Sequence, residues 1–395
     1  MRTKVFSSRK ADTALREENT SNQKDRVFPR FNDKRKYSST PQPSRLLLVQ
    51  MLRAVAALMI VLHHALPEAE RFAAASGAFA PSLQALLPWA AGVDIFFIIS
   101  GFVMVHASRT LFAQPGAVRV FLSRRLVRIV PLYWFATLAF LAVAIAMPQA
   151  LNGALPALPE VVASLFFIPY INGDGLAQPV FSLGWTLNYE MFFYLIFAMA
   201  LVLPRQRAVT AVAAGLAVLC GVGMMIDLPM PLSFWAAPIV LEFIFGMGLA
   251  LLRQTGWQPG AVLRILLFAA GVRMLEADLT QDGLTGGLAW GLPAAMIVGA
   301  LVLGNDPRWV RGTVGRVMSW LGDASYALYL MHPFALRGVR IMLEKTGTAA
   351  LVGPAGYIVL ALLAAVALAL AVHAVVEKPL HGRLLKMVVK EGDRR

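Results

Sequence analysis

The sequence contains a single cysteine, Cys220, among 395 residues. One thiol excludes an internal disulfide and any metal site built from several cysteines. Charged residues are also scarce, at 15% of the chain, whereas soluble domains average about 25%. Hydrophobic residues make up 58%, and the mean hydropathy is +0.65. This composition excludes an ordinary soluble enzyme, a disordered chain and a disulfide-stapled secreted domain, and it predicts an all-α polytopic membrane protein.

Sequence motifs of several common enzyme classes are missing as well. The chain has no Walker loop, no His-Glu-x-x-His pair and no Gly-x-Ser-x-Gly elbow. Each of these motifs is typical of one kind of phosphate, zinc or acyl chemistry. We therefore expect no bound metal and no resident cofactor.

Acidic residues are outnumbered by basic ones, 22 against 36, which leaves a formal net charge of +14. Half of this excess lies in residues 1–45, which hold twelve basic and five acidic residues. This segment has few large apolar residues and cannot bury enough surface to offset its ordering entropy. We expect it to be a disordered, basic cytoplasmic tail.

Hydrophobic runs long enough to cross a bilayer recur along the rest of the chain. A spanning helix needs roughly 20 mostly apolar residues. The candidate segments are 46–66, 87–107, 129–147, 182–203, 208–226, 232–252, 262–277, 288–304, 319–340 and 355–376. We therefore predict about ten transmembrane helices in a membrane domain over residues 46–379, followed by a basic cytoplasmic tail over residues 380–395. The run 161–170 is too short to span and is predicted to be interfacial or re-entrant.

Lys and Arg are nearly absent from one predicted side of the membrane. With the N-terminus in the cytoplasm, 30 of the 36 basic residues fall on the cytoplasmic side, five fall outside, and Arg53 lies within the first span. The positive-inside rule therefore places both termini in the cytoplasm. The positive charge records this topology, and we expect no nucleic-acid partner.

Ionisable residues within a bilayer are costly, so each is a candidate functional residue. Arg53 and His64 are eleven residues apart in the first span, a spacing that returns to within roughly 20° of one helix face. His63 points elsewhere. Glu190 lies among aromatic residues in the fourth span and needs a partner, which a histidine, a substrate hydroxyl or an arginine of a neighbouring helix would provide. Taken alone, Arg53 and the two histidines are explained equally well by anchoring of the helix ends at the membrane interfaces and by a function within the membrane.

Three arginines, Arg124, Arg125 and Arg128, cluster at the predicted cytoplasmic mouth of the third span. Guanidinium groups suit phosphate and pyrophosphate, although an ordinary positive-inside anchor is the simpler explanation. His332 lies near the middle of the ninth span. Glu377, Lys378 and Pro379 are predicted to close the tenth helix, with His373 one turn earlier; for this group an ion pair or cap is the expected role.

Six ordered motifs make the sequence similar to acyltransferase family 3 of integral-membrane proteins. They are Arg53 and His64 in the first span, Gly92 to Phe102 (Gly-Val-Asp-Ile-Phe-Phe-Ile-Ile-Ser-Gly-Phe), Arg125-x-x-Arg128, Trp185-Thr186-Leu187-x-x-Glu190, Leu321 to His332 and Glu377-x-Pro379. Each motif alone is weakly specific, whereas six in order are very specific. The resemblance covers about residues 46–379 and is strongest to the exopolysaccharide acetyltransferase type.

The resemblance implies an acyl-CoA-dependent O-acyltransferase of the bacterial inner membrane. Acetyl-CoA or another acyl-CoA would be the donor co-substrate, and a surface glycan or its lipid-linked oligosaccharide precursor the acceptor. We expect Arg53, Arg124, Arg125 and Arg128 to bind the donor. His64 is the expected general base, with His63 as its rival, and Glu190 is expected to orient His64 or bind the sugar. Trp185, Asn188, Tyr326 and His332 are candidates for substrate binding.

Two choices stay open at this level. Direct transfer with His64 as base and transfer through an acyl-histidine fit the sequence equally. A proton-coupled transporter of a small solute is the alternative function, because such proteins also place Arg, His and Glu within the membrane.

Overall fold

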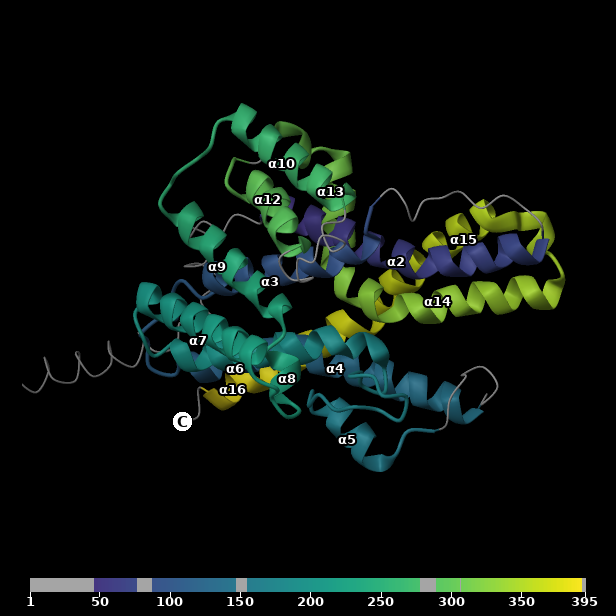
Figure 1. Ribbon diagram of the computed structural model, residues 1–395, viewed down its shortest axis with the longest axis horizontal. Coiled ribbons are helices and arrows are strands. Elements are labelled where there is room, and N and C mark those ends of the chain that lie inside the picture. The colour runs from purple at the N-terminus through teal and green to yellow at the C-terminus, as the bar shows by residue number, and fades with distance from the viewer. Residues whose placement is uncertain (1–45, 77–86, 147–154, 278–288, 306, 393–395) are drawn as a thin grey trace, which may run out of the picture.

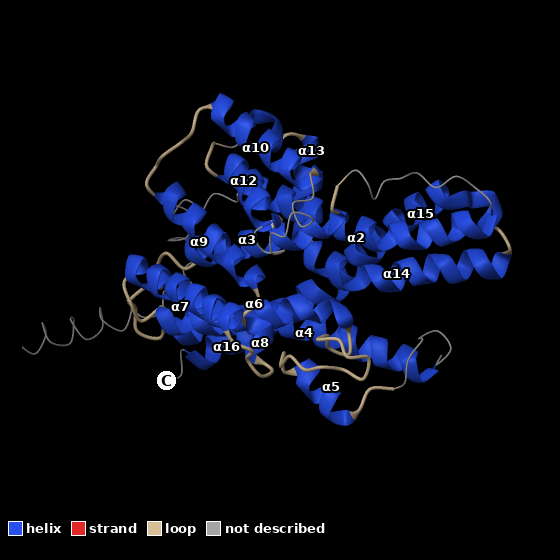
Figure 2. Cartoon of the chain, viewed as in Figure 1, coloured by secondary structure: helices blue, strands red, loops and turns tan. Residues whose placement is uncertain are grey.

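The computed structural model describes residues 46–76, 87–146, 155–277, 289–305 and 307–392. The predicted tail over residues 1–45 lies outside these ranges. Within them every regular element is a helix, and no strand is present (Figure 2). The all-α prediction is therefore confirmed for the described part of the chain.

The longer helices follow one another through short connections. They are α2 (Leu47–Ser76), α3 (Gly92–Ala107), α4 (Ala117–Ala146), α6 (Trp185–Ala200), α7 (Arg205–Met225), α9 (Leu241–Gln254), α10 (Ala261–Glu276), α12 (Gly291–Val302), α13 (Thr313–Asp323), α14 (Ser325–Thr346), α15 (Ala349–Val372) and α16 (Lys378–Gly392). Short helices α5 (Leu158–Leu165) and α8 (Leu232–Trp235) lie between them, together with 3-10 turns at Trp89–Ala91, Ser182–Gly184, Pro238–Val240 and Arg308–Arg311.

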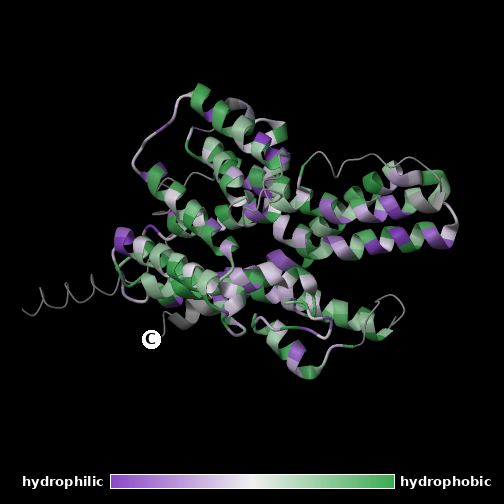
Figure 3. Ribbon diagram, in the orientation of Figure 1, coloured by the Kyte–Doolittle hydropathy of each residue, from purple (hydrophilic) through white to green (hydrophobic). Residues whose placement is uncertain are grey.

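Helices α2, α14 and α15 lie side by side and project to the right in Figure 1. Helix α3 packs between α2 and α9, and α12 covers both α3 and α9. Below them, α4 packs against α6 and α16. Hydrophobic residues cover much of most helices (Figure 3), as expected for a chain whose outer surface faces lipid.

Five helical stretches are long and apolar enough to cross a membrane: Leu47–Ala73, Trp89–Ala107, Ala117–Ala146, Arg205–Met225 and Ala349–Met387. These coincide with the first, second, third, fifth and tenth predicted spans, so the chain is a multi-pass membrane protein. Helices also occupy the other five predicted segments, but they are shorter or more polar. The full set of ten spans and the cytoplasmic location of the termini stay predictions.

Two predicted spans are interrupted. The segment 232–252 divides into α8, a 3-10 turn that begins at Pro238, and α9. A proline can begin a helix but has no N–H to continue one. The segment 319–340 divides at Ala324, where the chain leaves the α-helical conformation between α13 and α14.

The tenth predicted span does not close at Glu377-Lys378-Pro379, contrary to the sequence prediction. Residues His373–Glu377 form a π-helical turn that leads directly into α16. The turn places Pro379 in the first turn of α16, where its missing N–H needs no partner. His373 Nδ1 lies 2.8 Å from Glu377 Oε2, which confirms the expected pairing of these two side chains.

Contacts at the helix ends join connections predicted on the same side of the membrane. Arg264 Nε donates to the Ala300 carbonyl at 2.7 Å, and Arg253 Nη1 donates to the carbonyl of Gly304 at 3.2 Å. The first bond satisfies a carbonyl that α12 leaves unpaired at its C-terminus, and the second satisfies a carbonyl just beyond the helix. At the other end, Arg340 Nη1 lies 3.3 Å from Glu68 Oε2 and joins α14 to α2.

Close packing of α3 against α9 depends on glycine. A Cβ on Gly246 would lie 2.0 Å from the Ile98 carbonyl oxygen, and one on Gly101 would lie 2.2 Å from that of Phe243. Small residues of this kind allow helix backbones to approach within a membrane. Both contacts are with backbone atoms, which cannot rotate away.

We predict that Gly246→Ala destabilises the protein by about 1–3 kcal/mol, because the added methyl group forces α3 and α9 apart. Gly248→Ala, on the same helix, is the matched control, since no atom lies within 4 Å of its added Cβ. Thermal unfolding of the detergent-purified variants measures the difference. Equal unfolding temperatures for the two variants would contradict the packing argument.

Candidate active site

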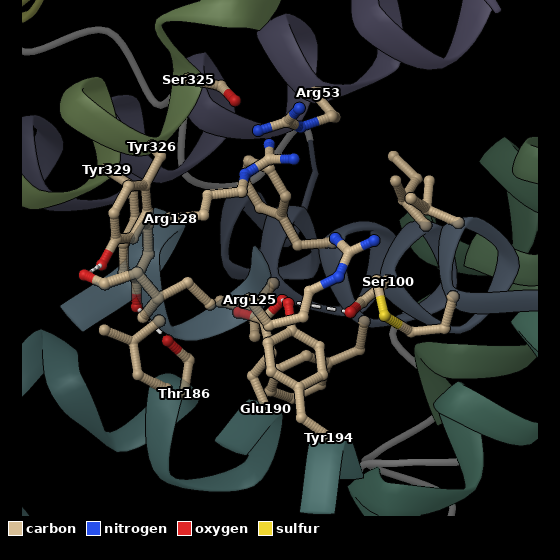
Figure 4. A pocket seen from close by; sticks show the side chains of 18 residues that line it. Arg53, Ser100, Arg125, Arg128, Thr186, Glu190, Tyr194, Ser325, Tyr326 and Tyr329 are labelled. Atoms are coloured by element: carbon tan, nitrogen blue, oxygen red, sulfur yellow. Dashed lines mark hydrogen bonds between the residues drawn. The ribbon is translucent and has the colours of Figure 1, made fainter. Parts of the chain in front are cut away.

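A cavity of about 110 Å³ lies between α2, α3, α4, α6 and α14. Its polar side chains come from every one of these helices (Figure 4): Arg53, Ser100, Arg125, Arg128, Thr186, Glu190, Tyr194, Ser325, Tyr326 and Tyr329. Apolar side chains such as Phe96 and Ile129 complete the wall. A cavity with few but convergent polar groups is the usual form of a small-molecule site.

Three of these side chains are arginines. Figure 4 shows the guanidinium groups of Arg53, Arg125 and Arg128 pointing into the cavity from α2 and α4. The Nε atom of Arg125 is buried and has no hydrogen-bond partner among the described residues. Buried donors are nearly always paired, so this one indicates a missing acceptor. Three converging cations at membrane depth favour an anionic ligand with several oxygen acceptors.

Glu190 is the one acidic residue among the described lining residues. Its Oε1 accepts from Ser100 Oγ at 3.1 Å and from the hydroxyl of Tyr194. The same tyrosine lies beneath Arg125, whose Cζ is 5.8 Å from the ring centroid. Glu190 therefore belongs to the arginine cavity, where one carboxylate offsets only part of the charge of three guanidinium groups.

The structure brings together most of the residues predicted to bind the donor, but not all of them. Arg124 is exposed on α4 and does not line the cavity. Adjacent helix residues point about 100° apart, so Arg124 cannot share the direction of Arg125.

Three of the four predicted substrate-binding residues, Trp185, Asn188 and His332, also lie outside the cavity. Trp185 packs edge-on against Tyr189, at 6.0 Å between ring centroids, and Asn188 is buried at 1% exposure. Neither of them lines the cavity. Tyr326 does, and its hydroxyl donates to the Ile129 carbonyl at 2.8 Å.

Tyr329 links the arginine cavity to a second polar cluster. Its hydroxyl lies 2.8 Å from Thr186 Oγ1 and donates to the Leu183 carbonyl at 2.9 Å. These contacts hold the ring in the wall of the cavity. Its centroid is 6.3 Å from that of His332, one turn further along α14.

His332 and His64 form the second cluster. The Nε2 atom of His332 lies 3.3 Å from Nδ1 of His64, and the ring centroids are 5.0 Å apart. His332 is fully buried, whereas His64 is exposed. Arg53 at the cavity and His64 at the histidine pair thus lie at two points of one helix, about 16 Å apart at 1.5 Å per residue.

Backbone contacts fix the proton positions of this pair. His64 Nδ1 is 2.9 Å from the Ile60 carbonyl oxygen, and His332 Nδ1 is 3.2 Å from that of Leu328. A carbonyl oxygen only accepts, so in the neutral rings both Nδ1 atoms carry hydrogen and both Nε2 atoms carry a lone pair. His332 Nε2 accepts from His64, and His64 Nε2 is left as a base.

These contacts give His64 a different partner from the one that the sequence suggested. Glu190 was expected to orient His64 or to bind the sugar, but its described hydrogen bonds are with Ser100 and Tyr194, and His332 fills the orienting position. His63 lies beside His64 with perpendicular rings, at 5.0 Å between centroids. No group of three His, Cys, Asp or Glu side chains within the described ranges is arranged to hold a metal ion.

Sequence reasoning missed Ser100, Thr186, Tyr194 and Tyr329. Tyr194 follows Glu190 by four residues and Tyr329 precedes His332 by three, so helical spacing alone could have placed them on the same faces. Ser100 lies in the second-span motif, six residues after Asp94, and only the packing of α3 against α6 reveals its contact with Glu190.

Comparisons with known proteins find related sequences along most of the chain. The sequence profile of the family described as "Acyltransferase domain" matches residues 48–374. The exopolysaccharide production protein ExoZ of Rhizobium meliloti is 35% identical over 305 residues, which cover 74% of this chain and 89% of ExoZ. The acyltransferase MdmB of Streptomyces mycarofaciens is 29% identical over 321 residues, or 73% of this chain and 79% of MdmB. No solved structure matches the chain.

Proposed function

Because this chain belongs to the acyltransferase family, we propose that it transfers an acyl group, with acetyl expected, from cytoplasmic acyl-CoA to a hydroxyl group of a surface polysaccharide or its lipid-linked precursor at the bacterial inner membrane. The observation that carries this proposal is the cavity in which Arg53, Arg125 and Arg128 converge. The similarity to ExoZ supports a carbohydrate acceptor. Family membership favours acyl transfer over the alternative of proton-coupled transport.

The donor occupies the arginine cavity in this proposal. Guanidinium groups bind phosphate oxygens through charge-assisted, often bidentate hydrogen bonds, so the three arginines hold the pyrophosphate of CoA. Glu190 keeps Arg125 in place through Tyr194 and limits the repulsion among the three cations. The pantetheine arm then follows the face of α2 from Arg53 past Tyr329 and delivers the thioester to His64.

His64 acts as the general base. Its Nε2 accepts the proton of the acceptor hydroxyl while the oxygen attacks the thioester carbon, so that a C–O bond forms and the C–S bond breaks. The proton then passes from His64 to the departing CoA thiolate. His332 accepts a hydrogen bond from His64 Nδ1 throughout, which holds the ring and stabilises its transient positive charge.

Substitutions of Arg124, Arg125 and Arg128 distinguish a role in binding the donor from a role in anchoring α4 at the membrane surface. We predict that Arg125→Ala and Arg128→Ala each raise KM for acetyl-CoA ~10- to 100-fold, because each removes charge-assisted hydrogen bonds to phosphate. Arg124→Ala, one residue away but outside the cavity, is the matched control and leaves KM nearly unchanged. Steady-state kinetics in proteoliposomes measure this, and an equal defect in Arg124→Ala would contradict the assignment.

Removal of the base affects turnover instead. His64→Ala is expected to lower kcat by ~100- to 10,000-fold, the usual contribution of a general base, while CoA binding in a thermal-shift assay stays intact. Incubation of the wild type with radiolabelled acetyl-CoA, followed by acid quenching, separates the two mechanisms. Covalent label on the protein indicates an acyl-histidine, and an unlabelled protein indicates direct transfer. Full activity in His64→Ala, with activity lost in His63→Ala, would assign the base to His63.

Position 332 tests the hydrogen-bond partner of His64. His332→Phe keeps the ring volume but removes the acceptor, and should lower kcat ~10- to 100-fold with little change in either KM. His332→Gln restores an acceptor oxygen and should recover most of the activity. A merely packing role predicts the reverse order, with Phe better tolerated than Gln.

A further inference from the structure

A second cavity, of about 360 Å³, opens beside the histidine pair, and none of its described lining residues also lines the arginine cavity. Its walls come from three parts of the chain: His63 and Pro67 of α2, Pro88 and Trp89 at the 3-10 turn that precedes α3, and Trp290 immediately before α12. The volume falls within the range of small-molecule sites.

The chemistry of this second cavity differs from that of the first. None of its described lining residues is charged, so it offers nothing to a phosphate. It combines two indole rings with the imidazole of His63. Indole faces pack against apolar C–H surfaces, and indole N–H and imidazole nitrogens make hydrogen bonds. A sugar ring has both features, with C–H faces and hydroxyl groups around its edge.

The two tryptophans are held by close backbone packing. A Cβ on Gly92 would lie 2.5 Å from the Ala56 carbonyl oxygen, so the start of α3 is pressed against α2 and Trp89 is fixed relative to His63. A Cβ on Gly291 would lie 2.8 Å from Cγ of Glu242, a side chain that is fully buried on α9. The start of α12, and Trp290 with it, is fixed in the same way. A preorganised site loses little freedom when a ligand binds.

We propose that this second cavity binds the sugar unit that receives the acyl group, with the ring between Trp89 and Trp290 and one hydroxyl directed past His63 to His64. The assignment rests on the proposed function. His63 lines the cavity, and its ring centroid lies 5.0 Å from that of His64. The base therefore lies between a cationic cavity for the donor and an uncharged cavity for the acceptor.

The role of His63 follows from this arrangement. It contacts the acceptor and guides the hydroxyl, whereas His64 takes the proton. His63 is thus a residue for acceptor binding, and a substitution there raises KM for the acceptor more than it lowers kcat.

The experiment compares Trp89→Leu, Trp290→Leu and Trp89→Phe with Trp257→Leu. Trp257 lies outside both cavities and is 46% exposed, which makes it the matched control. The acceptor probe is oligosaccharide from the producing strain's exopolysaccharide after mild-base removal of its ester groups, and the donor is radiolabelled acetyl-CoA. KM is measured for each substrate separately, and CoA-dependent thermal stabilisation verifies that every variant is folded.

The two leucine variants should raise KM for the oligosaccharide at least ~10-fold, as expected when a tryptophan that contacts the ligand is truncated, with KM for acetyl-CoA within twofold of wild type. Trp89→Phe should show a smaller rise in acceptor KM, because it keeps an aromatic face.

Acceptor KM values equal to those of Trp257→Leu would overturn this assignment but leave the proposed function in place. Unchanged acceptor KM in Trp→Leu variants together with altered inhibition by a lipid chain would indicate a lipid in the cavity and would also overturn it. Absence of any transfer by the wild-type protein would overturn the proposed function, and the acceptor site with it.

Discussion

Three guanidinium groups within a membrane domain impose the main constraint on this structure. A charge at this depth cannot face lipid, and like charges that converge need compensation. The helices meet both needs by turning Arg53, Arg125 and Arg128 inward around one cavity, next to Glu190. The glycine contacts that draw α3 against α9, and the tyrosines that close the wall, serve the same enclosure.

Helices α2 and α14 carry the path from this cavity to the histidines. Arg53 and His64 lie on one face of α2, and Tyr326, Tyr329 and His332 follow the same direction along α14. Because both helices are rigid over this length, the separation between the cationic end and the basic end is set by helix rise and does not depend on a loop. Such placement on regular helices gives more precise geometry than placement on connections.

Much of this arrangement could be predicted from the sequence. Hydrophobic length located helices in all ten candidate segments. The cost of intramembrane charge singled out Arg53, His64 and Glu190, and the clustering of basic residues before the third span singled out Arg124, Arg125 and Arg128. Their partners could not be predicted, because they depend on how each helix is rotated about its axis. The contrast between Arg124 and Arg125 shows this: two neighbours of the same type lie on different faces of α4, and only one enters the cavity.

The positions at which helices break or change type could not be predicted from the sequence either. Hydropathy carries no signal for the break at Ala324 or for the π-helical turn at His373–Glu377. Both depend on which residues can satisfy backbone groups locally. The partner of His64 could not be read from the sequence for a related reason: Glu190 was one candidate for orienting it, but Glu190 bonds to Ser100 and Tyr194, and the ring next to His64 is that of His332, 268 residues away along the chain.

The two cavities are lined by different sets of described residues, and this separation has a consequence for the membrane itself. Under the proposed function, CoA enters and leaves from one side, and the carbohydrate enters and leaves from the other. The pantetheine arm reaches His64 from the donor side, and only the acyl group passes on from there to the carbohydrate. Chemical energy stored in a cytoplasmic thioester is thereby used on the opposite side of the membrane without opening a continuous aqueous pore, so that ion gradients across the bilayer persist through every turnover.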